Sequence, residues 1–230
     1  MSALVSLSYD GTLLCHLHTA LPALDRHGLK GTFYAEPTLL LESVTEWREA
    51  QLAGHEIGNG CLFGSTLPDG SLPAWTPQMI VEDVEEADFL LEELFPEQDD
   101  HSLGMPWGRD SCADGQSYLA EVSQLFNVVR TGVTGLNPLP RPDCQRLQCV
   151  PTADFTGRQL ADVAQTAVRN AAWAIFAFEG IGTGDNAIDA AAHDYFLSYL
   201  ADNQDSVAVL PVIDAAFAAS GVGTPPLRLV

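Results

Sequence analysis

The stretch "LPALDRHGLKGTFYA", residues 21–35, leads from a helix into a strand. We predict a helix over residues 12–28 that ends at Gly28, because glycine readily takes the left-handed conformation found just past many helix ends. Residues 30–36, "KGTFYAE", are then predicted to form a strand. A helix that leads straight into a strand is one unit of a parallel α/β fold.

The same alternation continues on both sides of this stretch. Residues 76–95 give the clearest helix, since Thr76 can cap its start and Pro77 suits the first helical position. Residues 172–180, "AWAIFAFEG", are almost entirely apolar, which is typical of a strand covered on both faces. Further strands are predicted over 3–9, 55–59, 101–108, 127–133, 146–152 and 206–211, and further helices over 42–54, 115–126, 156–171, 187–203 and 212–220. The order predicts a parallel sheet or barrel.

Length and composition favour one domain that spans residues 1–230. The protein has 230 residues, of which 47% are hydrophobic, enough to bury a sizeable core. No repeat, low-complexity tract or linker interrupts it. We therefore expect a single fold.

The formal net charge is -21, from 31 acidic and 10 basic residues, and Lys30 is the one lysine. A surface of this sign repels nucleic acid and anionic lipid. We therefore expect no nucleic-acid or membrane partner, whereas a neutral or cationic ligand such as a sugar or an amine remains open. A second interpretation is that the acidity reflects only a salty habitat or a need for solubility.

The start of the sequence and its cysteines bear on cellular location and on disulfide formation. The start, "MSALVSLSYDG", lacks a basic region that leads into an apolar segment, so a cytoplasmic location is predicted. The five cysteines are an odd number and include no CxxC pair, so free thiols are expected rather than a disulfide framework or a zinc knuckle.

The informative residues are those at or just past the ends of the predicted strands, where the loops of a parallel barrel meet at one mouth. Each could be an ordinary turn residue or helix cap. They are Asp10, Glu36, Asn59, Gly60, Trp107, Arg109, Arg130, Thr131, Asp154 and Glu179.

Asp10 and Glu179 are the candidate catalytic pair. Two carboxylates in one mouth shift each other's ionisation and can divide the roles of acid and base. Glu179 follows an unbroken apolar run, so its side chain is expected to be buried and to need a partner. Arg130, a basic residue near the end of another predicted strand, is the candidate partner. A structural ion pair of Glu179 with Arg130 is the alternative to a functional role.

Five segments in order resemble the polysaccharide deacetylase family, also called the NodB-homology domain, over nearly the whole sequence. "VSLSYDG" is similar to its T-F-D-D-G motif, and "LPALDRHGLKGTFYA" to the helix and strand that follow. "AGHEIGNG" resembles the run into its H-x-x-x-H motif, "MPWG" its third motif and "FAFEGIG" its last, usually H-G-I. The resemblance implies a distorted (β/α)7 barrel of the polysaccharide deacetylase / glycoside hydrolase-deacetylase type.

Active members of that family remove acetyl groups from N-acetylated sugars or hydrolyse other non-peptide carbon-nitrogen bonds, using a zinc-like ion held by one aspartate and two histidines. Here Asp10 stands alone where two aspartates are usual, and it could fill either the metal-ligand position or that of the base. Gly60 and Gly64 fall on the histidine positions, and Glu179 falls on the late catalytic histidine. The resemblance therefore implies no bound metal.

A divalent metal ion is expected to bind only if other residues replace the missing ligands. His16 and His18 follow Asp10 closely, and Cys61 lies beside a vacated position, so an Asp/His/Cys site is conceivable. An H-x-H pair on a helix points its rings to different faces, which argues against it. His55 is expected to be structural.

Three functions stay open. A pseudoenzyme would bind a small carbohydrate or acetylated amine, or a partner protein, without hydrolysis; Trp107 would stack on a sugar, while Asn59, Arg130 and Asp154 would fix its polar groups. Trp107 could instead cap the core. The second is a metal-free hydrolase or lyase that uses Asp10 and Glu179, and the third a weak deacetylase with replaced ligands. Alanine-rich helical faces such as residues 187–196 would also allow a homo-oligomer.

Overall fold

The computed structural model describes residues 3–62, 76–105, 108–112, 114–184 and 186–220. Parallel strands close into a seven-stranded barrel, because the last of them, β8, pairs again with β1. Round the ring these strands are β1 (Ala3–Asp10), β2 (Thr32–Ala35), β3 (Glu56–Asn59), β4 (Leu103–Gly104), β5 (Val129–Thr134), β7 (Leu147–Pro151) and β8 (Ala172–Phe178). The predicted (β/α)7 barrel is confirmed.

Two further strands distort the ring. The start of β1 (Ala3–Val5) pairs with β9 (Val207–Val209), and the end of β1 (Ser8–Asp10) pairs along the same edge with β2. β6 (Asn137–Pro138) likewise shares an edge of β8 with β7, in the antiparallel direction. The predicted strand over 206–211 therefore exists but lies outside the seven-stranded ring, and β6 was not predicted.

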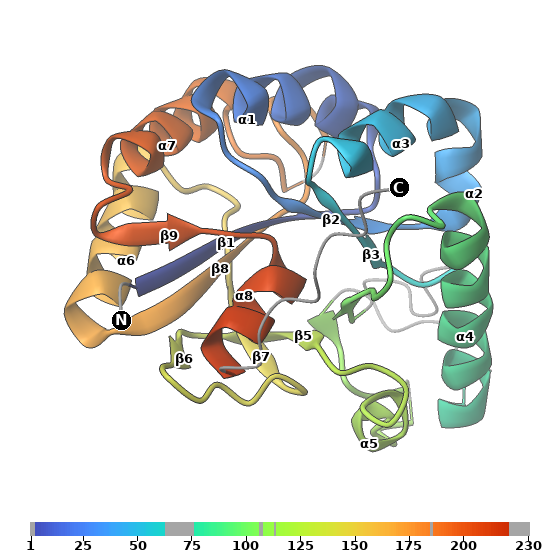
Figure 1. Ribbon diagram of the computed structural model, residues 1–230. Coiled ribbons are helices and arrows are strands. Elements are labelled where there is room, and N and C mark those ends of the chain that lie inside the picture. The colour runs from blue at the N-terminus through green and yellow to red at the C-terminus, as the bar shows by residue number, and fades with distance from the viewer. Residues whose placement is uncertain (1–2, 63–75, 106–107, 113, 185, 221–230) are drawn as a thin grey trace.

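Helices follow one another round the outside of the strands (Figure 1). In sequence order these are α1 (Leu21–His27), α2 (Pro37–Leu40), α3 (Val44–Leu52), α4 (Pro77–Leu94), α6 (Gly157–Asn170) and α7 (Ala190–Asp202). Gly28 ends α1 with a φ of 65°, and the Thr76 hydroxyl accepts a hydrogen bond from the Met79 amide at the start of α4, as predicted. None of the described helices is long and apolar enough to span a membrane.

Short helical turns fill the remaining connections. A π-helix (His16–Ala20) precedes α1, a 3-10 turn (Leu41–Ser43) follows α2, and α5 (Leu119–Val122) precedes β5. The helix predicted over 115–126 is thus much shorter than expected, and α2 with its 3-10 turn was not predicted. Among the described residues between β4 and β5, the longest helix is therefore α5, with four residues.

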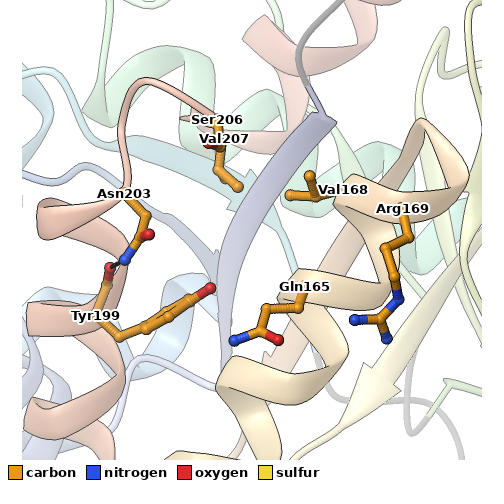
Figure 2. A pocket seen from close by; sticks show the side chains of 7 residues that line it. All are labelled: Gln165, Val168, Arg169, Tyr199, Asn203, Ser206 and Val207. Carbon is orange, nitrogen blue, oxygen red and sulfur yellow. Dashed lines mark hydrogen bonds between the residues drawn. The ribbon is translucent and has the colours of Figure 1, made fainter.

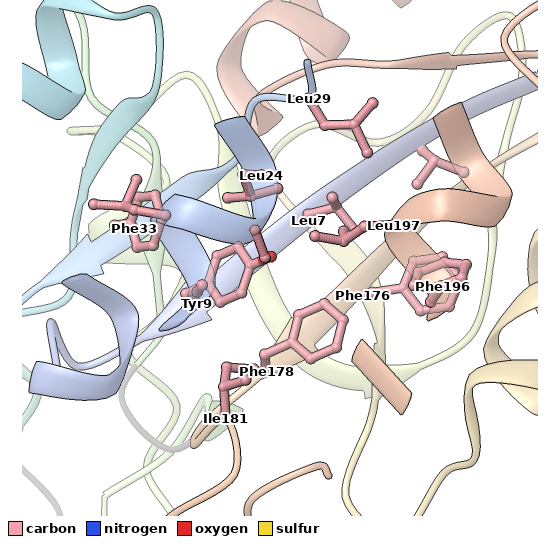
Figure 3. Packing of buried hydrophobic residues seen from close by; sticks show 14 of the residues in the cluster. Leu7, Tyr9, Leu24, Leu29, Phe33, Phe176, Phe178, Ile181, Phe196 and Leu197 are labelled. Atoms are coloured by element: carbon pink, nitrogen blue, oxygen red, sulfur yellow. The ribbon is translucent and has the colours of Figure 1, made fainter. Parts of the chain in front are cut away.

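Alternate residues of the strands face two different environments. Figure 3 shows Leu7 and Tyr9 of β1 packed among Phe33, Phe176 and Phe178, in the layer between strands and outer helices. The intervening residues of β1, which are Ser6, Ser8 and Asp10, therefore face the inside of the barrel. The interior is polar on this strand, so its groups must be paired within it.

The last described helix, α8 (Val212–Ser220), closes the amino end of the barrel through the buried carboxylate of Glu56. Glu56 accepts hydrogen bonds from the Thr32 hydroxyl at 2.6 Å and from the Ile213 amide at 3.0 Å. The amide and hydroxyl of Ser102 donate to its other oxygen. A carboxylate at the start of a helix also interacts favourably with the helix dipole, so Glu56 fixes α8 to the strands.

Three of the four buried histidines, His16, His55 and His193, have strongly lowered pKa values. The hydroxyl of Tyr9 lies 2.9 Å from Nε2 of His193, and His16 meets the edge of the Tyr9 ring. His55 accepts a hydrogen bond from the Gly31 amide at 3.2 Å, which confirms that it is structural. Burial lowers the pKa of His16 and of His55 to about 4 and that of His193 to about 3, so all three are neutral in the folded protein near pH 7.

These histidines predict acid sensitivity. The unfolded protein binds protons at an ordinary pKa of 6.5, whereas the folded protein does not until about pH 4, so the free energy of unfolding falls as the pH drops through this window. Each histidine contributes a slope of at most about 1.4 kcal/mol per pH unit. Urea denaturation at a series of pH values measures it.

His193→Gln should reduce the slope below about pH 6, and His18→Gln is the matched control because His18 is exposed. Equal slopes for the parent and His193→Gln would contradict the assignment.

Glu56→Gln should lower the free energy of unfolding by about 2–4 kcal/mol, because an amide cannot accept from all of the donors that surround the carboxylate. Glu46→Gln, on the exposed face of α3, should change it by less than about 0.5 kcal/mol. Chemical denaturation compares the two. Similar values for both variants would show that Glu56 does not hold α8.

Candidate functional site

An ion pair joins Asp10 and Arg130 at the mouth of the barrel. Asp10 ends β1, and Arg130 lies in β5 on the far side of the ring. Nη2 of Arg130 donates to Oδ1 of Asp10 at 2.7 Å. The arginine side chain is 4% exposed and the aspartate 34%, so the guanidinium lies beneath the carboxylate, which faces solvent.

The surroundings of Arg130 keep it charged. Its guanidinium carbon lies 4.8 Å from the centre of the Tyr34 ring, within range of a cation–π interaction. Burial alone would lower its pKa, but the charge of Asp10 and other nearby groups outweighs that effect, and the pKa of Arg130 is raised. Nη1 lies 3.8 Å from Sγ of Cys149, and within the described part of the protein no group accepts from Nε.

Tyr34 fills the barrel beneath this ion pair. A Cβ atom on Gly58 would lie 2.7 Å from the Tyr34 ring, and one on Gly104 would lie 2.6 Å from it. These two strand positions must therefore be glycine for the ring to fit. The Ser102 hydroxyl gives its single proton to Glu56, so at 3.1 Å it accepts a hydrogen bond from the Tyr34 hydroxyl. Contacts thus run from α8 through Tyr34 and Arg130 to Asp10.

Glu179 follows β8, next to the end of β1, since Phe178 pairs with Tyr9. Its carboxylate accepts a hydrogen bond from the Asn186 amide at 2.8 Å. The predicted alternative, an ion pair of Glu179 with Arg130, is wrong, because the guanidinium bonds Asp10. The two candidate catalytic residues thus end neighbouring strands, while their carboxylates bond different partners.

Gly60, on one of the two histidine positions, has no room for a side chain. A Cβ atom there would lie 2.8 Å from the carbonyl oxygen of Ala35 and 2.9 Å from backbone atoms of Tyr34. The Gly60 amide donates to that same Ala35 carbonyl at 2.8 Å. The backbone of β2 therefore occupies the space that a histidine would need, whereas Gly64 lies outside the described residues.

The side chains that the sequence suggests as metal ligands are not arranged to bind a metal ion. The carboxylate of Asp10 is bound to a buried cation. Nδ1 of His16 accepts from the Leu13 amide and Nε2 donates to the Glu179 carbonyl, so neither nitrogen is available. His18 is exposed, and burial raises the pKa of the Cys61 thiol. Within the described residues, no group of three His, Cys, Asp or Glu side chains could hold a metal ion.

The structure places two of the four predicted ligand contacts at the mouth of the barrel and one away from it. Asn59 does not line the mouth: its buried amide donates to the Val84 carbonyl of α4 at 2.9 Å and accepts from the Cys61 amide at 2.9 Å. Asp154 is exposed in the turn between β7 and α6, at the mouth end of the barrel. Trp107 lies outside the described residues. Of the four predicted contacts, Arg130 and Asp154 remain at this end.

One acidic pair was missed by sequence reasoning. The pKa of Glu36, which follows β2, is raised by burial and then by the charge of Asp83. Asp83 is buried on α4, between Ile80 and Val84 in the apolar stripe of that helix. The sequence signal for this pair was an acidic residue within the apolar stripe of α4. It was overlooked because the exposed face of the same helix also carries many acidic residues.

Comparison with known proteins depends on structure alone. No family model matches the sequence, and no curated protein is similar to it. The fold resembles the Xyl-CE4 domain of a multidomain xylanase from the hindgut metagenome of Trinervitermes trinervoides, with a TM-score of 0.65 and 12% identity over 97% of this protein and 93% of that one.

Two other solved structures have a similar fold. Peptidoglycan deacetylase PdaC from Bacillus subtilis has a TM-score of 0.63 and 11% identity, over 96% of this protein and 93% of that one. The family 4 acetyl xylan esterase from Clostridium thermocellum, in complex with a cobalt ion, has a TM-score of 0.60 and 16% identity over the same shares. The protein therefore has the distorted (β/α)7 barrel fold of the CE4 polysaccharide deacetylases.

Proposed function

We propose that this protein is a deacetylase-like barrel that binds a small carbohydrate or acetylated amine at its mouth without the metal-dependent hydrolysis found on this fold. The solved structures with this fold support the ligand class, since one is a deacetylase with its substrate. Others are mutants of a CE4 family pseudoenzyme, one of them with restored enzymatic activity. The fold is thus compatible with loss of catalysis.

The observation that carries the proposal is the ion pair of Asp10 with Arg130. A divalent ion bound to Asp10 would lie within a few ångströms of a guanidinium that is almost completely buried and cannot release its proton. Like charges at that distance repel strongly away from water. The internal cation therefore takes the part in neutralising Asp10 that a metal ion would otherwise have.

The exposed third of the Asp10 side chain leaves this carboxylate able to accept hydrogen bonds from a ligand hydroxyl or amide. Glu179 and Asp154 add acceptors at the same end of the barrel. A mouth with acceptors above a buried cation suits a neutral, hydrogen-bonding ligand better than an anion, which the net charge of -21 would repel.

A metal-free hydrolase is the second candidate, favoured by the position of Asp10 and Glu179 at the ends of neighbouring strands. Assays against acetylated sugars and amides with the parent, Asp10→Asn and Glu179→Gln separate the candidates. Turnover by the parent that both variants lose, although each still unfolds cooperatively well above the assay temperature, would favour this second function. If the panel produces neither turnover nor a thermal shift, the proposed carbohydrate ligand is wrong.

Protein purified without chelator should contain far less than one equivalent of zinc, cobalt or nickel, because Asp10 is already neutralised and Gly60 offers no donor. Elemental analysis and calorimetric titration with Zn²⁺ measure this, with a metal-dependent deacetylase as the positive control. Gly60→His should not create a site, and should lower stability because its Cβ meets the backbone of β2. Stoichiometric metal in the parent protein would overturn the proposal.

Asp10 and Arg130 should be strongly coupled in stability. Arg130→Met should lower the free energy of unfolding by about 2–4 kcal/mol, because it leaves a partly buried carboxylate unpaired, and Asp10→Asn should also destabilise. The double variant should lose less than the sum of the two. A double-mutant cycle by urea denaturation tests this, and additivity within about 0.5 kcal/mol would contradict it.

A further inference from the structure

A cleft of about 330 Å³ opens between α6, α7 and the turn that leads into β9 (Figure 2). Val207, the first residue of β9, lies in its wall and pairs with Ala3 at the start of β1. The cleft is therefore at the amino end of the barrel, away from the mouth where Asp10 lies. Its volume is at the lower end of the range of ligand pockets, about 300–1,000 Å³.

Side chains from two helices converge on this cleft with polar groups that the fold does not use. Figure 2 shows the ring of Tyr199 from α7 and the amide of Gln165 from α6 reaching towards each other. Within the described part of the protein, neither the Tyr199 hydroxyl nor the Gln165 amide makes a hydrogen bond. Asn203 donates to the Tyr199 carbonyl at 2.7 Å, which fixes its amide while its own oxygen remains available.

The remaining walls add an apolar surface and one cation. Val168 and Val207 lie near each other at the end of the cleft away from the Tyr199 ring, and Ser206 contributes a hydroxyl. The guanidinium of Arg169 donates to the Thr166 hydroxyl at 2.7 Å and is exposed, so it is partly engaged and well hydrated. Neutral donors and acceptors beside an aromatic ring thus dominate the cleft.

We propose that this cleft is a second binding site, for a small, neutral, hydroxyl-rich ligand of the saccharide type. A sugar ring has apolar C–H faces that pack on Tyr199 and Val168, and hydroxyls that both donate to and accept from Gln165, Asn203 and Ser206. An anion is disfavoured, because Arg169 is a single cation on a protein with a net charge of -21. The site is independent of the function proposed for the mouth.

Titration of the isotope-labelled full-length protein with D-glucose, D-xylose and N-acetyl-D-glucosamine, followed by NMR, tests the site. At least one sugar should produce saturable shifts in residues 165–169 and 199–207. Tyr199→Phe should weaken binding by about threefold to tenfold, since it removes one hydrogen bond. Tyr195→Phe is the matched control, because Tyr195 is exposed on the same helix and does not line the cleft.

Val168→Trp should fill the cleft and weaken binding further, whereas Asp10→Asn should leave these shifts unchanged even if it alters binding at the mouth. Glucuronate serves as the anionic probe and should bind more weakly than glucose. The proposal is overturned if no neutral sugar gives saturable shifts here, if Tyr199→Phe and Val168→Trp bind like the parent, or if glucuronate binds more tightly.

Discussion

The ion pair between Asp10 and Arg130 is the contact on which the mouth of this barrel depends. A buried guanidinium is tolerated only where a carboxylate compensates its charge, and removal of either partner leaves the other stranded. The arginine lies on Tyr34, and Tyr34 fits only because Gly58 and Gly104 lack side chains. The charge pair, the aromatic ring and the two glycines are therefore one arrangement, in which a change at any member disturbs the others.

At the amino end of the barrel a buried charge is also compensated by its neighbours, but that charge is negative. There the buried group is an anion, Glu56, and the compensating donors include the Ile213 amide in the first turn of α8. Ser102 connects the two ends, because its hydroxyl contacts both Glu56 and Tyr34. Polar groups that would destabilise the interior if they were unpaired become a specific set of contacts, and these determine where α8 and the first strand must lie.

Local signals made most of the fold predictable, but the site depends on closure of the ring. Gly28 and Thr76 mark helix ends by their own chemistry, so the helices beside them were found. The partner of Arg130 is not a local property: Asp10 and Glu179 were both plausible, and the registers of β1, β5 and β8 decide between them. Asn59 sits at a strand end as predicted, yet its side chain turns outward to α4, because strand residues alternate between faces.

The pairing of β1 has a consequence for biosynthesis. One edge of β1 is completed by β8, which is made about 170 residues later, and on the other edge only the end of β1 pairs early, with β2, whereas its start waits for β9, made about 200 residues later. Contacts this distant in sequence slow folding and leave apolar strand edges unprotected in the meantime. The ring therefore cannot close during synthesis until β8 has emerged, and the β8 edge of the first strand stays open until then.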